Sequence, residues 1–190
     1  MIYKYYCDGA ATMRKVNGEY VREMGGYAWA SVDTENDKIL KWNSAQVFNA
    51  TNNEMELSAI HNALCHHGYP EGFNIVEIYS DSAYCINIFT QWIKNWEANG
   101  WTRGKKHEPI ENLDIIKSIW EMVKKLSEGF SEVRFIKVAG HSGDKYNEIV
   151  DKFAVEAKEG KKFIGPVSRR YLDEYVYPED VFLFNISIME

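Results

Sequence analysis

Three stretches with strand character follow one another at the start of the chain, before any helical pattern. Residues 2–8, 25–33 and 38–48 are rich in aromatic and β-forming side chains, and polar segments separate them. Further strands then alternate with helices. Consecutive strands usually pair antiparallel, whereas strands joined through a helix pair in parallel. This order therefore predicts an α/β (α+β type) fold, with a mixed sheet that carries helices on both faces.

The rest of the chain supplies two more strands, which makes a five-stranded sheet. The predicted order is a helix from about Asn53 that ends before Gly68, a strand at 73–80, a helix from Asp81-Ser82 through Trp96, a helix at 112–127, a strand at 130–138 and a helix at 146–159. Residues 10–24 are polar, and we interpret them as an extended loop or a hairpin tip. Asp8-Gly9 is interpreted as the turn that stops the first strand.

Length and composition indicate an ordinary globular protein. The chain has 190 residues, 45% hydrophobic residues and a formal net charge of −6, which suits one domain with an appendage. The net charge argues against a protein that holds nucleic acid by bulk positive charge. No signal peptide or membrane span is visible, and the three cysteines are widely spaced. We therefore expect a cytoplasmic protein with reduced thiols and no membrane contact.

Two acids near the start of the predicted helix at 53 cannot share one role. Glu54 and Glu56 point to nearly opposite sides of a helix, because only positions three or four apart share a face. Glu56 heads an apolar stripe through Ala59, Ile60 and Ala63, and the face of Glu54 is mostly polar. A buried ionised carboxylate is unfavourable unless another group pairs with it.

Three further acids stand at the ends of predicted elements. Asp8 ends the first strand, Asp81 ends the fourth, and Asp151 lies beside the apolar stripe of the last helix. Neighbouring strands would bring Asp8 and Asp81 close together, where two ionised carboxylates repel unless a cation lies between them. With Glu56 added, an oxygen-only set of this kind favours hard divalent cations, Mg²⁺ or Mn²⁺.

Each acid also has a purely structural interpretation. Asn53 and Glu56 have the spacing of a capping box. Asp81 fits a helix N-cap, Asp8 fits a turn, and Asp151 fits an exposed helical acid. Taken one at a time these roles are reasonable, but the four acids together point to one site.

The same segments carry a family resemblance. CDGAA, TNNEMEL, IYSDSAY with QWIKNW, and GHSGDKYNEIVDKFA resemble successive motifs of the type 1 ribonuclease H family, in the same order along residues 1–159. The resemblance implies a ribonuclease H-like fold. It also implies a catalytic and metal-binding carboxylate set of Asp8, Glu56, Asp81 and Asp151, with His141 as an auxiliary catalytic residue. Glu54 is then a surface residue.

The resemblance further implies an activity and its cofactors. Members of the family are endonucleases that hydrolyse the RNA strand of RNA–DNA hybrids by a two-metal-ion mechanism and leave 5′-phosphate and 3′-hydroxyl ends. The implied cofactors are two Mg²⁺ ions, for which Mn²⁺ can substitute. We expect a monomer.

Substrate contacts are inferred from matching motif positions and from the basic segment after Trp92. The expected substrate-binding residues are Gly9, Thr51, Asn52, Asn53, Trp92, Lys94, Asn95, Trp96 and Trp101. Helix capping is the alternative role for residues 51–53, and a cluster that holds the segment together is the alternative for the tryptophans. Glu97, Ala98 and Asn99 depart from the family's usual cationic residues, which weakens the expected contact there.

Two other functions remain open from the sequence. One is a DNA-acting nuclease of the same fold, similar to an integrase or resolvase, and the other is a hybrid-binding module without catalysis. Residues 160–190 extend past the family's usual last helix and end in the apolar run VFLFNISIM. We interpret residues 1–159 as the catalytic domain and 160–190 as a C-terminal extension of unknown role, with a contact to a partner protein as one option.

Overall fold

The computed structural model describes residues 1–140 and 143–161, and these form one sheet covered by helices. The strands are β1 (Ile2–Val16), β2 (Glu19–Asp33), β3 (Lys38–Ala50), β4 (Ile75–Ser80) and β5 (Glu132–Lys137), in the spatial order β3-β2-β1-β4-β5. β1, β2 and β3 pair antiparallel, and β1, β4 and β5 pair in parallel. The predicted five-stranded mixed sheet is confirmed.

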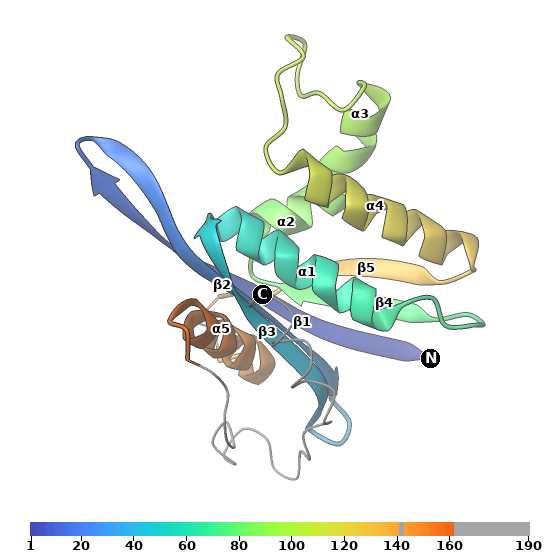
Figure 1. Cartoon of the computed structure of the whole chain (residues 1–190). Coiled ribbons are helices and arrows are strands. Elements are labelled where there is room, and N and C mark those ends of the chain that lie inside the picture. The colour runs from blue at the N-terminus through green and yellow to red at the C-terminus, as the bar shows by residue number, and fades with distance from the viewer. Residues whose placement is uncertain (141–142, 162–190) are drawn as a thin grey trace, which may run out of the picture.

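Helices cover both faces of this sheet (Figure 1). They are α1 (Asn52–His67), α2 (Ala83–Asn87), the π-helical turn η1 (Ile88–Trp92), α3 (Ile93–Ala98), α4 (Leu113–Glu128) and α5 (Lys145–Lys158). One core cluster joins α1 and α4 to one face of the sheet, with Leu57, Ile60 and Ile116 fully buried. A second cluster joins α5 to the other face through Val150 and Phe153. The sheet is thus the middle of three layers.

Pairing between β1 and β4 places two of the acids side by side. Tyr6 pairs with Tyr79 in the parallel register, and Asp8 and Asp81 each follow this pair by two residues. β4 ends one residue before Asp81. The carboxyl ends of parallel strands at the centre of a sheet are where ligand sites form in α/β folds.

The first strand differs from the prediction. Asp8 does not end it, because β1 continues to Val16 and pairs with β2 from Val16↔Glu19 onward. Residues 10–24 therefore form a β-hairpin, which settles the alternative left open between a loop and a hairpin. Its turn is Asn17-Gly18, with φ of 51° and 90°, the left-handed pair that suits a two-residue hairpin turn. The sequence pattern does not identify this part of the strand, because it has several charged side chains and few apolar ones.

The helix that follows β4 is divided into α2, η1 and α3. Ser82 caps it, and its side chain accepts a hydrogen bond from the Cys85 amide, so Asp81 is not the N-cap. Within η1, the Thr90 hydroxyl donates to the Ile86 carbonyl at 2.6 Å. A threonine hydroxyl that binds this carbonyl competes with the regular helical bond and favours a local irregularity. The segment that follows projects from the molecule at α3 (Figure 1).

Candidate active site

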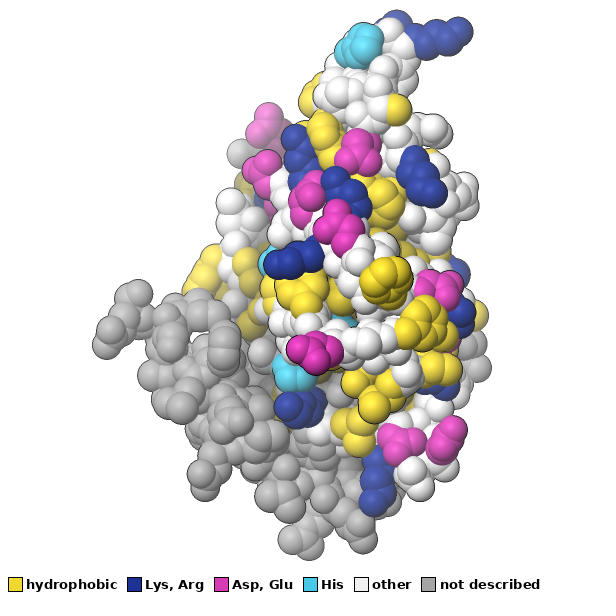
Figure 2. Space-filling view, turned by 90° about the vertical axis from the view of Figure 1, so that its right-hand side faces the viewer, with side chains coloured by type: hydrophobic (Ala, Val, Ile, Leu, Met, Phe, Trp, Pro, Cys, Tyr) yellow, Lys and Arg dark blue, Asp and Glu magenta, His cyan; other side chains and the backbone are white. Residues whose placement is uncertain are grey.

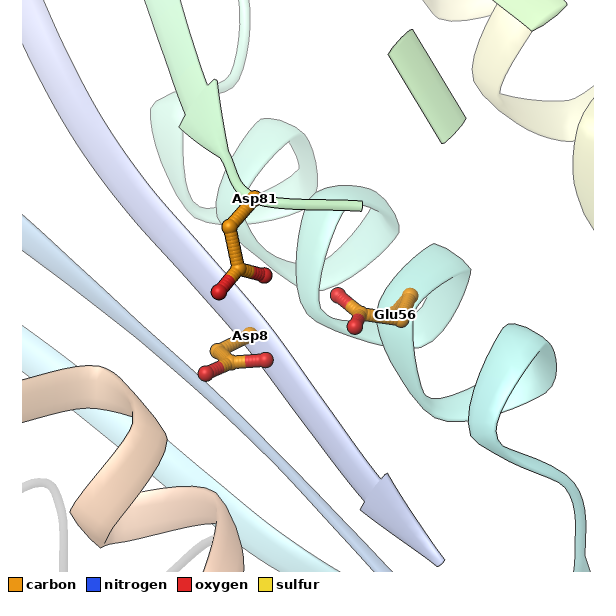
Figure 3. Close-up of side chains that lie close together, drawn as sticks. All are labelled: Asp8, Glu56 and Asp81. Carbon is orange, nitrogen blue, oxygen red and sulfur yellow. The ribbon is translucent and has the colours of Figure 1, made fainter. Parts of the chain in front are cut away.

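Three carboxylates from three separate elements meet at the end of β4 (Figure 3). Asp8 comes from β1, Glu56 from the first turns of α1, and Asp81 from the residue after β4. One oxygen of each lies within 4.8 Å of the others, and this is the one group of three possible metal ligands among residues 1–140 and 143–161. The convergence that the sequence predicts for these three acids is present.

Helix capping is performed by a different pair from the one considered in the sequence. Thr51 is the N-cap of α1, its side chain accepts from the Glu54 amide, and Glu54 accepts from the Thr51 amide at 2.7 Å. This is a complete capping box. The alternative in which Asn53 and Glu56 form the box is wrong, because Thr51 and Glu54 occupy those positions. Glu56 is therefore left without a capping role and points into the site.

The position of Glu56 depends on Gly9. A Cβ built on Gly9 would lie 2.2 Å from the Glu56 amide nitrogen and 2.3 Å from the Met55 carbonyl carbon. Contacts this short are impossible, so α1 can approach β1 this closely only because residue 9 has no side chain. The close approach brings the Glu56 carboxyl beside Asp8.

Burial and mutual repulsion raise the pKa of two of these acids. Asp8 is 5% exposed, and burial, followed by the charge of Asp81, raises the pKa of its carboxyl. Burial and then the charge of Asp8 raise the pKa of Glu56 as well. The Gly9 amide donates to Asp8 at 2.7 Å and opposes part of this shift. The site is thus unfavourable for three full negative charges without a cation.

The helix α5 contributes to the site from the opposite face of the sheet. Asp151 is outside the group within 4.8 Å, but its charge contributes to the raised pKa of both Asp8 and Glu56. Asn147 lies one helical turn earlier on the same face. Its side-chain nitrogen donates to Asp81 at 3.2 Å, and Asn147 is only 2% exposed. This residue was not predicted, although an asparagine within the apolar stripe of that helix was a usable signal.

The donor set suits a hard divalent cation. All the candidate ligand atoms are carboxylate oxygens, which Mg²⁺ and Mn²⁺ prefer. Glu56 Oε2 is buried and has no hydrogen-bond partner in the part of the chain that the structure describes. A buried acceptor without a partner is unfavourable, and a cation among the three carboxylates would satisfy it.

These shifts predict how the stability of the metal-free protein depends on pH. The folded state holds protons on Asp8 and Glu56 more tightly than the unfolded chain does, so the free energy of unfolding falls as pH rises through neutrality. We expect the melting temperature in EDTA to fall over this range more for the wild type than for Glu56→Gln. The histidines titrate in both proteins, so the difference between their melting temperatures reports on Glu56. Parallel curves of melting temperature against pH would contradict the raised pKa of Glu56.

The start of α1 holds three of the predicted substrate residues, and two of them have structural contacts. Thr51 is the N-cap. The Asn52 side-chain oxygen accepts from the Ala11 amide at 2.6 Å, which joins the helix to β1. Asn53 is partly buried in the first turn. Capping, one of the alternatives from the sequence, therefore holds for Thr51.

The segment from Trp92 to Trp101 carries further predicted contacts. Trp92 and Trp96 lie with their ring centroids 5.7 Å apart, and Lys117 stands 4.9 Å above the Trp101 ring. All three tryptophans are partly buried against the main core, in agreement with a cluster that holds the segment together. Lys94 and Asn95 are exposed on α3. Figure 2 shows basic side chains at the tip of this segment and mixed charges on the face below it.

Comparison with known proteins identifies the family. The family model of RNase H matches residues 2–159. A ribonuclease H of Clostridium botulinum is 39% identical over 154 residues, which cover 80% of this chain and 92% of that protein. The chain belongs to the ribonuclease H family. A ribonuclease H of Treponema pallidum is 38% identical over 115 residues, covering 60% of this chain and 63% of that protein.

Solved structures share the fold of this chain. LC9-RNase H1, a type 1 RNase H with the type 2 active-site motif, matches with a TM-score of 0.65 and 24% identity over 85% of this chain and 74% of that one. The foamy viral protease-reverse transcriptase in complex with an RNA/DNA hybrid matches with a TM-score of 0.67 and 18% identity, over 83% of this chain and 20% of that one. Membership of the family makes the protein a ribonuclease.

His141 and residues 162–190 lie outside the described residues. In the described part, no helix has the length and apolar character needed to cross a membrane.

Proposed function

We propose that this chain is an endonuclease that hydrolyses the RNA strand of RNA–DNA hybrids with two divalent cations and leaves 5′-phosphate and 3′-hydroxyl ends. The single observation that carries the proposal is the convergence of Asp8, Glu56 and Asp81 in a member of the ribonuclease H family. The foamy viral relative of the same fold was solved with an RNA/DNA hybrid, which supports the substrate class.

The carboxylates are the proposed ligands of the cations. The charges of Asp81 and Asp151 raise the pKa of both Asp8 and Glu56, so the four acids form one electrostatic cluster. We propose that Asp8, Glu56 and Asp81, together with Asp151, would hold the two ions. When bound, Mg²⁺ ions would activate the attacking water and neutralise charge on the leaving oxygen, and Mn²⁺ would substitute for them.

Other residues would orient the site and the substrate. Asn147 donates to one oxygen of Asp81 and so would hold the other oxygen available for a cation. His141 is proposed to transfer protons, for which an imidazole titrating near neutrality is suited. Gly9, Thr51, Asn52 and Asn53 are proposed to contact the hybrid beside the carboxylates. Trp92, Lys94, Asn95, Trp96 and Trp101 are proposed to follow the DNA strand.

The proposal also covers the organisation of the chain. Residues 1–159 form the catalytic domain and act as a monomer in the cytoplasm. Residues 160–190 form an extension that would contact a partner protein.

The test compares nucleic acids of one sequence. The purified chain is incubated in Mg²⁺ with four end-labelled substrates. These are an RNA–DNA hybrid, duplex RNA, single-stranded RNA and duplex DNA. We expect cleavage of the RNA in the hybrid only, abolished by EDTA and restored by Mg²⁺ or Mn²⁺, with products that a phosphatase converts to 5′-hydroxyl ends. Preferential cleavage of duplex DNA would favour the integrase-like alternative. Hybrid binding without cleavage in either metal would favour the non-catalytic one.

A further inference from the structure

The β1–β2 hairpin carries its charges unevenly on its two sides. Met13 pairs with Arg22, and Lys15 pairs with Tyr20. Paired residues share a side, and alternate residues along a strand share it too. One side of the hairpin therefore presents Met13, Lys15, Tyr20 and Arg22, and we call it the Lys15 side.

The opposite side holds the acids of the hairpin. By the same alternation, it presents Arg14, Val16, Glu19 and Val21. Arg14 forms an ion pair with Glu23 at 2.8 Å, so the one cation of this side is neutralised while Glu19 remains. The Lys15 side has two cations and no acid of the hairpin.

Two contacts fix the Lys15 side relative to the active site. Arg22 forms an ion pair with Glu54 at 3.2 Å, and Glu54 is itself held in the capping box of α1. The Asn52 side chain accepts from the Ala11 amide at 2.6 Å. The base of the hairpin is thus attached to the first turn of α1, two residues before Glu56. Figure 1 shows the hairpin extending from the sheet beyond this end of α1.

The outer part of the Lys15 side remains available to a ligand. Tyr20 is 70% exposed, and Lys15 is exposed and stands 5.7 Å from the centroid of the Tyr20 ring. No ion pair among residues 1–140 and 143–161 includes Lys15. A free ammonium beside an exposed aromatic ring suits a phosphate with its adjoining sugar.

We propose that Lys15 and Tyr20 bind the sugar-phosphate backbone of the hybrid, outside the segment held at the carboxylates. This inference rests on the proposed function, because it takes the hybrid as the ligand of the neighbouring site. Lys15 follows Asp8 by seven residues, which span at most about 23 Å of strand. At about 3.4 Å for each base pair, the contact lies up to about seven base pairs from the cleaved bond.

The test compares two alanine variants, one of a lysine and one of an arginine, that change the net charge equally. Lys15→Ala and Arg14→Ala each remove one cation from adjacent positions, on opposite sides of the hairpin. Binding is measured by fluorescence anisotropy in Mg²⁺ with Asp81→Asn also present, so that the hybrid stays uncut. For a hybrid of about 20 base pairs, we expect Lys15→Ala to raise Kd about fivefold and to reduce the slope of log K against log salt by about one. Arg14→Ala should change Kd less than about twofold.

Two comparisons separate this inference from the proposed function. In the active enzyme, Lys15→Ala should raise KM for the long hybrid with kcat unchanged. For a hybrid of about six base pairs the effect on KM should be smaller, because fewer base pairs extend from the cleaved bond toward Lys15. Equal affinities of Lys15→Ala and Arg14→Ala for the hybrid would overturn the inference. An equal effect of Lys15→Ala on KM for both hybrids would also overturn it. In either case, cleavage by the wild type would still support the proposed function. Absence of wild-type cleavage would instead overturn the proposed function.

Discussion

Replacing Asp81 with asparagine should reduce Mg²⁺-dependent cleavage of a hybrid about a thousandfold or more while the fold stays intact. The change removes one charge of the three that meet within 4.8 Å and keeps the shape of the side chain. A thousandfold loss corresponds to about 4 kcal/mol of transition-state stabilisation. Asn147, which donates to Asp81 at 3.2 Å, can donate equally to an amide oxygen, so the local structure has no reason to change.

The control for this variant is Asp114→Asn. Asp114 is an exposed acid in the first turn of α4, so the same loss of charge occurs away from the site. Its cleavage rate should stay within about twofold of the wild type. Without metal, Asp81→Asn should melt at the wild-type temperature or above it, because one repulsive charge is gone. Cleavage by Asp81→Asn at the wild-type rate would contradict the assignment of Asp81.

Adding one methyl group at Gly9 should destabilise the protein by about 3 kcal/mol or more. The new Cβ would lie 2.2 Å from the Glu56 amide nitrogen and 2.3 Å from the Met55 carbonyl carbon. Both are backbone atoms, so no change of rotamer relieves the overlap and α1 must move away from β1. Because this movement displaces Glu56 from Asp8, Gly9→Ala should also weaken Mg²⁺ binding. Urea denaturation and calorimetric titration with Mg²⁺ measure the two effects.

Gly129→Ala provides the matched comparison. Gly129 ends α4, and a Cβ there would have its nearest contact with the Leu126 carbonyl oxygen at 3.4 Å. Its φ of −80° suits any residue. We expect a change within about 0.5 kcal/mol in the free energy of unfolding. A Gly9→Ala protein as stable as Gly129→Ala would show that β1 and α1 do not pack as closely as described.

Sequence patterns predicted the sheet and the meeting of three acids for a definite physical reason. Parallel neighbours end at the same edge of a sheet, and strand order follows from where helices interrupt the strands. Asp8 and Asp81 were therefore expected side by side as the ends of neighbouring strands. β1 in fact continues past Asp8 to Val16, and the Tyr6–Tyr79 pairing supplies the register that places the two acids together. Helical periodicity placed Glu56 on the buried face of its helix, and the family resemblance supplied its role as a ligand.

The errors arose where several local patterns fitted the same residues. Thr51 with Glu54 and Asn53 with Glu56 both have the spacing of a capping box, and only the start of α1 in the structure decides between them. The sequence did not decide whether residues 10–24 form a loop or a hairpin. The two strands of this hairpin are stabilised by pairing with each other rather than by an apolar stripe. Asn147 was missed because its partner, Asp81, lies 66 residues away in the sequence.

A crystal of the wild-type chain grown with Mn²⁺, studied by an anomalous difference map, would show directly whether the three carboxylates bind metal. We predict at least one peak about 2 Å from carboxylate oxygens of Asp8, Glu56 and Asp81, and no peak there in a Glu56→Gln crystal. A map in which Mn²⁺ lies elsewhere, or in which these three carboxylates turn away from one another, would contradict this prediction.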